Sequence, residues 1–181
     1  MDRTSIINDL IVKFGYQSYL EIGLGPVSNF GQIKAKHKIG VDPNPACKLS
    51  PNVITLTSDE FFSTCRTTFD IIFIDGLHLR NQVLTDVTNA LNALNPNGTL
   101  VLHDVNPPTE QHAGPVYVPG TDWNGTVWQA WAVLRMSRPD LEMYVHDVDW
   151  GVGIIRHGSQ KVFDLPYSFW DQHRKELLNA R

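Results

Sequence analysis

The chain has 181 residues, 42% hydrophobic and 19% charged, a composition typical of a globular domain rather than of a disordered or fibrous chain. Its formal net charge is −4, and its fifteen Lys and Arg residues are dispersed, so no basic stripe indicates nucleic acid as a partner. No apolar run approaches the ~20 residues that cross a bilayer, and no signal-like segment opens the sequence. We therefore expect one cytoplasmic domain over residues 1–181 that binds neither nucleic acid nor a membrane.

The first expected element is an amphipathic helix over residues 3–14, where apolar residues recur at three- and four-residue intervals. Seven short apolar runs predict strands: Tyr19–Ile22, Lys38–Val41, Val53–Leu56, Ile71–Ile74, Thr99–Leu102, Glu142–Val145 and Gly153–Ile155. A helix is expected over Asn81–Leu94, ended by turn residues 95–98. Because several runs are apolar on both faces, we predict an α/β fold with a mostly parallel sheet between helices.

The stretch from Val105 to Trp123 carries four prolines and two glycines and has no periodicity. It is longer than most connections without secondary structure, and such loops are usually functional or disordered. It follows a strand end, which places it over the carboxyl edge of the sheet, where open α/β sheets bind ligands. We interpret residues 105–123 as a lid over an acceptor site, with disorder as the alternative.

A glycine-rich turn follows the first predicted strand and leads into a helix. Gly23 and Gly25 permit a tight turn and close approach of the backbone to a ligand, and Asp42 ends the next strand with a carboxylate that can accept both hydroxyls of a ribose. Two glycines alone also fit an ordinary turn. Position 28 is Ser28 rather than the third glycine of a dinucleotide fingerprint, which disfavours NAD or FAD and favours a nucleoside without phosphates.

Four segments occur in the order of one known family. They are Leu20–Gly25 (LEIGLG), Ile39–Pro43 (IGVDP), Phe69–His78 (FDIIFIDGLH) and Leu94–Asp104 (LNPNGTLVLHD). Over residues 1–156 the chain resembles class I S-adenosylmethionine-dependent methyltransferases, and within them the branch that includes macrolide-sugar O-methyltransferases. The resemblance implies a Rossmann-like, seven-stranded, mostly parallel sheet with an antiparallel last strand, and a cofactor-binding half over residues 1–104.

The resemblance also assigns residues to S-adenosylmethionine: Glu21, Gly23, Gly25, Asp42, Ser58, Asp59 and Asp75. The first three belong to the loop that wraps the methionine part, and Asp42 matches the ribose-binding acid. Ser58 and Asp59 match the position that meets the adenine, although Asp59 also fits a helix N-cap. Val27 stands where the family often has a third glycine, so the loop departs from the usual pattern there.

Asp75 and Asp104 end two strands that one helical crossover separates, so we expect their carboxylates to lie close together. Two close carboxylates are normally neutralised by a proton or a cation, and oxygen ligands suit Mg²⁺. The resemblance implies that these two acids bind Mg²⁺ and that His78, with Asp75, serves catalysis, His78 as the base. The alternative is that the two acids only cap following helices or order the lid.

The relatives commonly place another acid or amide beside the second acid. This chain has His103 before Asp104 and Val105 after it, so Asn106 or water are the candidates for the remaining ligand. By strand alternation we expect His103 to point away from Asp104 and to be a structural, hydrogen-bonded histidine.

The expected activity is transfer of a methyl group from S-adenosylmethionine to a hydroxyl of a small, sugar-like acceptor. Removal of the acceptor proton needs a base or a metal, which His78 and the two acids would provide. Two alternatives remain open: a metal-independent N- or C-methyltransferase, and a catalytically silent nucleoside-binding accessory protein. The sequence leaves the oligomeric state open, including a homo-oligomer.

Overall fold

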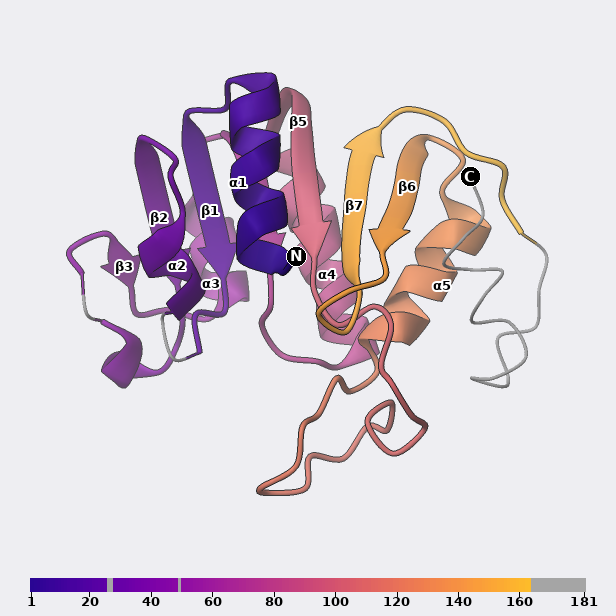
Figure 1. Ribbon diagram of the computed structural model, residues 1–181. Helices are drawn as coiled ribbons and strands as arrows, with labels where there is room; N and C mark the ends of the chain where they lie inside the picture. The colour runs from indigo at the N-terminus through magenta and orange to yellow at the C-terminus, as the bar shows by residue number, and fades with distance from the viewer. Residues whose placement is uncertain (26–27, 49, 164–181) are drawn as a thin grey trace.

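The computed structural model describes residues 1–25, 28–48 and 50–163. Its centre is a seven-stranded sheet with helices on both faces (Figure 1). The strands are β1 (Ser18–Ile22), β2 (His37–Val41), β3 (Val53–Ile54), β4 (Phe69–Ile74), β5 (Leu94–Leu102), β6 (Leu141–His146) and β7 (Val152–His157). The helices are α1 (Arg3–Phe14), α2 (Ser28–Gln32), α3 (Ser58–Thr64), α4 (Arg80–Asn92) and α5 (Val127–Ser137), with a 3₁₀ turn η1 at Pro45–Cys47.

The strand order is β3-β2-β1-β4-β5-β7-β6, which confirms the predicted Rossmann-like α/β fold. Neighbours from β3 to β5 pair in parallel, and β7 runs antiparallel to both β5 and β6. The arrow of β7 therefore points opposite to those of β5 and β6 in Figure 1. Strand order reverses between β1 and β4, the switch point at whose carboxyl edge open α/β sheets bind ligands.

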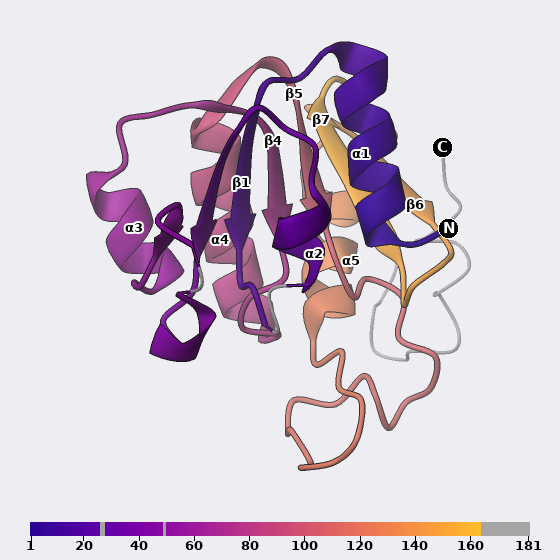
Figure 2. The same ribbon diagram turned by 60° about the vertical axis from the view of Figure 1, so that its left-hand side comes forward.

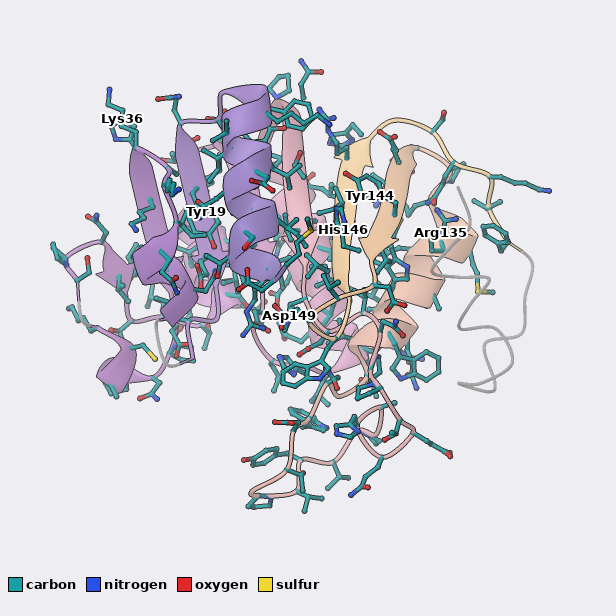
Figure 3. The ribbon with its side chains drawn as sticks, in the orientation of Figure 1. Tyr19, Lys36, Arg135, Tyr144, His146 and Asp149 are labelled. Carbon is teal, nitrogen blue, oxygen red and sulfur yellow. The ribbon has the colours of Figure 1, made fainter. Side chains whose placement is uncertain are left out.

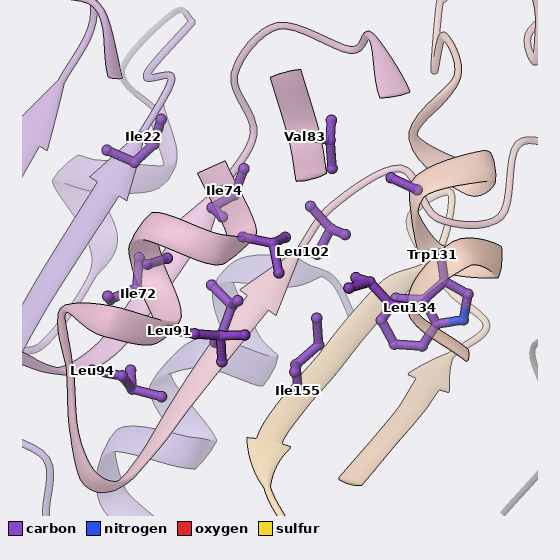
Figure 4. Close-up of a cluster of buried hydrophobic side chains, with 14 of the residues drawn as sticks. Ile22, Ile72, Ile74, Val83, Leu91, Leu94, Leu102, Trp131, Leu134 and Ile155 are labelled. Carbon is purple, nitrogen blue, oxygen red and sulfur yellow. The ribbon is translucent and has the colours of Figure 1, made fainter. Parts of the chain in front are cut away.

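Strand β4 shows why both faces of the sheet carry helices. Ile72 and Ile74 pack into the apolar cluster built with α3, α4 and α5, part of which Figure 4 shows. Ile71 and Phe73 face the other way, into the cluster built with α1 and α2. All four side chains are at most 1% exposed. A strand buried on both sides reads as a continuous apolar run, which is the signal that predicted the parallel sheet.

Helix α1 confirms the amphipathic segment predicted over residues 3–14. Asp2 caps its start by accepting a hydrogen bond from the Ser5 amide at 2.8 Å. Gly15 ends it in the left-handed conformation, with φ of 70°. The buried residues of the helix lie on one face and contact the sheet: Ile6, Ile7, Leu10 and Ile11. In Figures 1 and 2 its N-terminal end lies at the carboxyl edge of β1 and β5.

The turn predicted at residues 95–98 is wrong, because these residues belong to β5. The helix before them ends at Asn92, and Leu94 pairs with Phe69 of β4 across a register shift. The Asn95 side chain donates to Asp70 at 2.8 Å. Pairing with β4 therefore extends the strand through residues whose own preference is for a turn. Strand β3 is also shorter than predicted and ends at Ile54.

Residues 105–126 form the long connection that the sequence predicts, without helix or strand. They leave the carboxyl edge of β5, project away from the sheet and return to α5 (Figures 1 and 2). Hydrogen bonds hold them in shape: the indole N–H of Trp123 donates to the Gly114 carbonyl within the loop, and that of Trp128 in α5 donates to the Ala113 carbonyl. No helix within the described ranges is long and apolar enough to cross a bilayer.

Candidate active site

A cavity of about 530 Å³ opens at the carboxyl ends of β1, β2 and β4. Six of the seven residues predicted to hold the cofactor line it: Gly23, Gly25, Asp42, Ser58, Asp59 and Asp75. Its further walls come from Val41, Pro43 and the Gly76–Leu77 pair. A space of this size suits a nucleoside-sized ligand. Val27, at which the loop departs from the family pattern, lies outside the described residues.

The glycine turn brings the end of β1 against the end of β4. Gly23 has φ of +82°, and a Cβ at this position would lie 2.2 Å from the carbonyl oxygen of Asp75. The Gly23 amide donates to Val41, and the Asp75 amide donates to Ile22, both at 2.8 Å. Only glycine meets both the dihedral and the spatial requirement here. Gly25 also has positive φ, +51°, but space around it is open.

Asp42 holds the turns on both sides of the cavity. One of its carboxylate oxygens accepts a hydrogen bond from the Leu24 amide and the other from the Asn44 amide, each at 2.8 Å. A carboxylate has about four acceptor sites, so both oxygens retain capacity for the hydroxyls of a ribose. Asp42 therefore has a structural role in addition to its predicted ligand role.

Glu21 does not line the cavity, unlike the other predicted cofactor residues. Its carboxyl group is 1% exposed and accepts hydrogen bonds from the Tyr19 hydroxyl at 2.5 Å and from the Asn29 amide at 3.0 Å. Burial raises the pKa of Glu21 to about 8, against the opposing effect of these two hydrogen bonds. Glu21 thus lies in the interior next to the glycine turn and not in the cavity wall. Its hydrogen-bond partner Tyr19, also on β1, is labelled in Figure 3.

Ser58 and Asp59 begin α3, but neither is its cap. The cap is Thr57, which forms a capping box with Glu60. This excludes the N-cap interpretation of Asp59. The side chain of Gln82 in α4 donates to Ser58 at 3.3 Å and to Asp59 at 3.1 Å, and it also lines the cavity. Sequence reasoning missed Gln82, because nothing in its spacing sets it apart from other polar residues of α4.

Asp75, His78 and Asp104 come together as predicted. One ligand atom from each residue lies within 4.8 Å of the other two. His78 Nε2 is 3.3 Å from Asp75, and His78 Nδ1 is 3.2 Å from Asp104. The N-cap residues of α4 and α5 are Leu79 and Thr126, so neither acid has the capping role considered as one alternative. Asp104 does accept a hydrogen bond from Asn124 of the long loop, as the other alternative, ordering of the lid, predicts. Burial lowers the pKa of His78, but its contacts with the two acids outweigh burial and raise it overall.

The expectation that His103 points away from Asp104 is wrong. His103 is 2% exposed, and its Nδ1 lies 3.2 Å from Asp75 and 3.2 Å from Asp104. Strand β5 ends at Leu102, and the chain turns at Asp104 with φ of +62°, so strand alternation no longer applies. Burial opposes both charges, but their mutual attraction raises the pKa of His103 and lowers that of Asp75.

The turn between β6 and β7 adds a residue that sequence reasoning did not assign to the site. The carbonyl of Asp149 accepts a hydrogen bond from His103 at 2.8 Å, and its carboxylate accepts one from the Arg3 amide at 2.9 Å. Figure 3 places Asp149 beside the N-terminal end of α1. Asp149 and Trp150 have φ of 50° and 58°, a conformation that costs energy and concentrates at functional sites.

The connection from the long loop into α5 packs directly on His78. The Trp123 carbonyl accepts a hydrogen bond from His78 Nδ1 at 2.9 Å, and the two rings stack with centroids 5.4 Å apart. The Thr126 amide donates to the His78 carbonyl at 2.8 Å. A carbonyl can only accept, so it holds the ring proton of His78 on Nδ1.

Comparisons with known proteins agree with this architecture. Residues 28–105 match a methyltransferase domain family. The SAH-bound methyltransferase PaMTH1 of Podospora anserina superposes with a TM-score of 0.65 at 19% identity, covering 87% of this chain and 78% of that one. The SAH complex of the O-methyltransferase from Bacillus cereus gives 0.62 at 13%, covering 86% and 80%. The N-methyltransferase NodS of Bradyrhizobium japonicum gives 0.56 at 18%, covering 88% and 95%.

Among curated proteins, the sequence finds no significant match. The family match covers less than half of the chain, and the solved structures show that the chain has the fold of S-adenosylmethionine-dependent methyltransferases, with a cavity at the switch point of the sheet. At these identities the solved structures show the fold alone. They include both an O- and an N-methyltransferase, so the acceptor has to be argued from the residues of the site.

The first prediction concerns Glu21. The folded state keeps its proton up to about pH 8, whereas the unfolded chain loses it near 4.5, so this group makes folding stability fall as pH rises between these values. The slope is at most about 1.4 kcal/mol per pH unit. Glu21→Gln keeps a neutral acceptor, so its stability relative to wild type should increase from pH 5 to pH 8. Urea unfolding at several pH values measures this, and a pH-independent difference would contradict the assigned pKa.

The second prediction concerns Asp42→Ala. Loss of a charged hydrogen-bond partner costs about 1.5–3 kcal/mol, so the affinity for S-adenosylhomocysteine should fall by roughly 10–100-fold. Isothermal titration calorimetry measures the affinity. Asp140→Ala is the control, because Asp140 is an exposed acid paired with Arg138 at the start of β6. Unchanged affinity in folded Asp42→Ala would remove Asp42 from the binding site.

Proposed function

We propose that this protein is an S-adenosylmethionine-dependent methyltransferase that acts on a hydroxyl group of a small, sugar-like acceptor. The observation that carries the proposal is the position of Asp75. This residue lines the cofactor cavity and also contacts His78, so a base lies directly beside the space for the methyl donor. An oxygen acceptor needs such a base, because its proton must leave as the new bond forms.

The residues of the site have separate tasks in this reaction. S-adenosylmethionine supplies the methyl group, whose bond to sulfur breaks as its bond to the acceptor oxygen forms. His78 keeps a ring proton on Nδ1, against the Trp123 carbonyl, so the nitrogen that takes the acceptor proton is Nε2, once it has lost its own proton. Asp75, 3.3 Å from Nε2, stabilises the positive charge that His78 then gains. Holding acceptor and donor side by side supplies the rest of the acceleration.

A divalent cation fits the chemistry of the donor set. Asp75 and Asp104 would hold it through carboxylate oxygens, the ligands that Mg²⁺ prefers. When bound, Mg²⁺ would orient the acceptor hydroxyl and lower its pKa. His78 would remain the proton acceptor beside it.

A second candidate is a metal-independent methyltransferase acting on nitrogen or carbon. It is favoured by His103, which lies 3.2 Å from both acids and can neutralise them without a cation. An amine acceptor needs no strong activation of a hydroxyl, so a site already paired in this way would suffice.

The third prediction separates these functions. The 181-residue protein is incubated with methyl-labelled S-adenosylmethionine and a panel of sugars, other hydroxylated compounds and amines, before and after chelation. Mass spectrometry should detect a labelled O-methyl product whose formation chelation abolishes and Mg²⁺ or Mn²⁺ restores. Full activity after thorough chelation would favour the metal-independent candidate, and labelled amines alone would refute the hydroxyl acceptor.

The fourth prediction concerns His78→Ala, assayed with the acceptor that this panel reveals. Removal of a general base lowers turnover by about 10²–10⁴-fold. The affinity for S-adenosylhomocysteine should stay near that of wild type, because His78 does not line the cofactor cavity. His157→Ala, at the exposed far end of β7, serves as the control. Near-normal turnover in a folded His78→Ala variant would exclude His78 as the base.

A further inference from the structure

Asn124 lies at the end of the long loop and is 1% exposed. Its side-chain amide donates to Asp104 Oδ1 at 2.6 Å. Its carbonyl oxygen Oδ1 is buried and has no hydrogen-bond partner among the described residues. A buried acceptor without a partner loses its hydrogen bonds to water with nothing in return, and native proteins rarely leave one in that state. The structure thus contains a buried acceptor beside one of the two acids of the site.

The orientation of this amide is determined by its neighbour. A carboxylate only accepts hydrogen bonds, so the NH₂ end must face Asp104, and exchanging the two ends would set two oxygens against each other. The backbone is equally constrained. Gly125 has φ of +60° and no space for a Cβ, which would lie 2.1 Å from the His78 carbonyl oxygen. The Asn124 amide N–H donates to the His112 carbonyl at 3.1 Å.

We propose that Asn124 Oδ1 is a further protein ligand of the divalent cation held by Asp75 and Asp104. The inference rests on the proposed metal site. A neutral amide oxygen is a good ligand for Mg²⁺ and adds no charge repulsion next to two carboxylates. The Asn124 amide nitrogen is hydrogen-bonded to Asp104, and Oδ1 is attached to the same amide carbon as this nitrogen. Oδ1 therefore lies close to one of the two predicted ligands.

Asn106, the amide that the sequence offers for this role, has a different position. It is 3% exposed, and its side-chain amide donates to Asp147 in the turn between β6 and β7. Asn124 instead contacts Asp104 itself. A ligand from the end of the long loop would also couple cation binding to the position of Trp123, which packs on His78.

The fifth prediction tests this role by direct cation binding to the 181-residue protein. Electron paramagnetic resonance of free Mn²⁺ gives the affinity, and thermal unfolding with and without Mn²⁺ gives the stabilisation on binding. Wild type should bind Mn²⁺. Asn124→Ala and the similarly sized Asn124→Leu should bind about 10–100-fold more weakly and lose most of the Mn²⁺-induced rise in Tm. Asn124→Ser, whose hydroxyl oxygen is too short to take the place of Oδ1, should also bind more weakly than wild type.

Asn106→Ala is the matched control, a buried asparagine beside the same loop, and should bind Mn²⁺ like wild type. Wild-type affinity in folded Asn124→Ala and Asn124→Leu would overturn the role of Asn124 and leave the two-aspartate site standing. Weaker binding in Asn106→Ala alone would overturn it in favour of Asn106. No Mn²⁺ binding by wild type would refute the proposed cation site and this inference together. If the Ala and Leu variants fail to fold, wild-type Mn²⁺ affinity in folded Asn124→Ser would contradict the proposal.

Discussion

The site depends on one close backbone contact, that between Gly23 at the end of β1 and Asp75 at the end of β4. The position that a Cβ of residue 23 would take lies 2.2 Å from the Asp75 carbonyl oxygen, so a glycine is required there. This contact sets the cofactor turn directly against the strand end that carries Asp75. The parallel register aligns the end of β5 with the ends of β1 and β4, since Ile22 pairs with Ile74 and Ile74 pairs with Leu102. Gly23, Asp75 and His103 therefore leave the sheet at one level.

The two carboxylates at this edge of the sheet, those of Asp75 and Asp104, remain ionised because positively charged side chains lie next to them. Asp75 and Asp104 share two imidazoles, those of His78 and His103, each within about 3.3 Å. Arg3 adds a positive charge 3.8 Å from Asp75. Buried carboxylates without such partners would take up protons. The two acids can thus be neutralised in two ways, by a cation held between them or by the two histidines.

Local patterns predicted much of the framework, because they report on backbone and burial. Apolar runs located all seven strands, and helical spacing located α1. Asp75 and Asp104 were predicted to approach each other because neighbouring parallel strands end at one edge. Predictions from local patterns were wrong where strand pairing or a backbone turn determined the conformation instead. Residues 95–98 have turn preferences but extend β5, and His103 faces the acids because the strand has already ended.

The sequence by itself determined the α/β class, the glycine turn and the approach of Asp75 to Asp104, since each depends on residues at a strand end or a short distance beyond it. Only the tertiary structure decided which distant segments complete the site. Asp149 meets Arg3 across 146 positions, and Asn124 meets Asp104 across 20. These contacts depend on how the β6–β7 turn, the start of α1 and the long loop pack at one sheet edge, and packing between separate segments leaves no periodic signal in the chain.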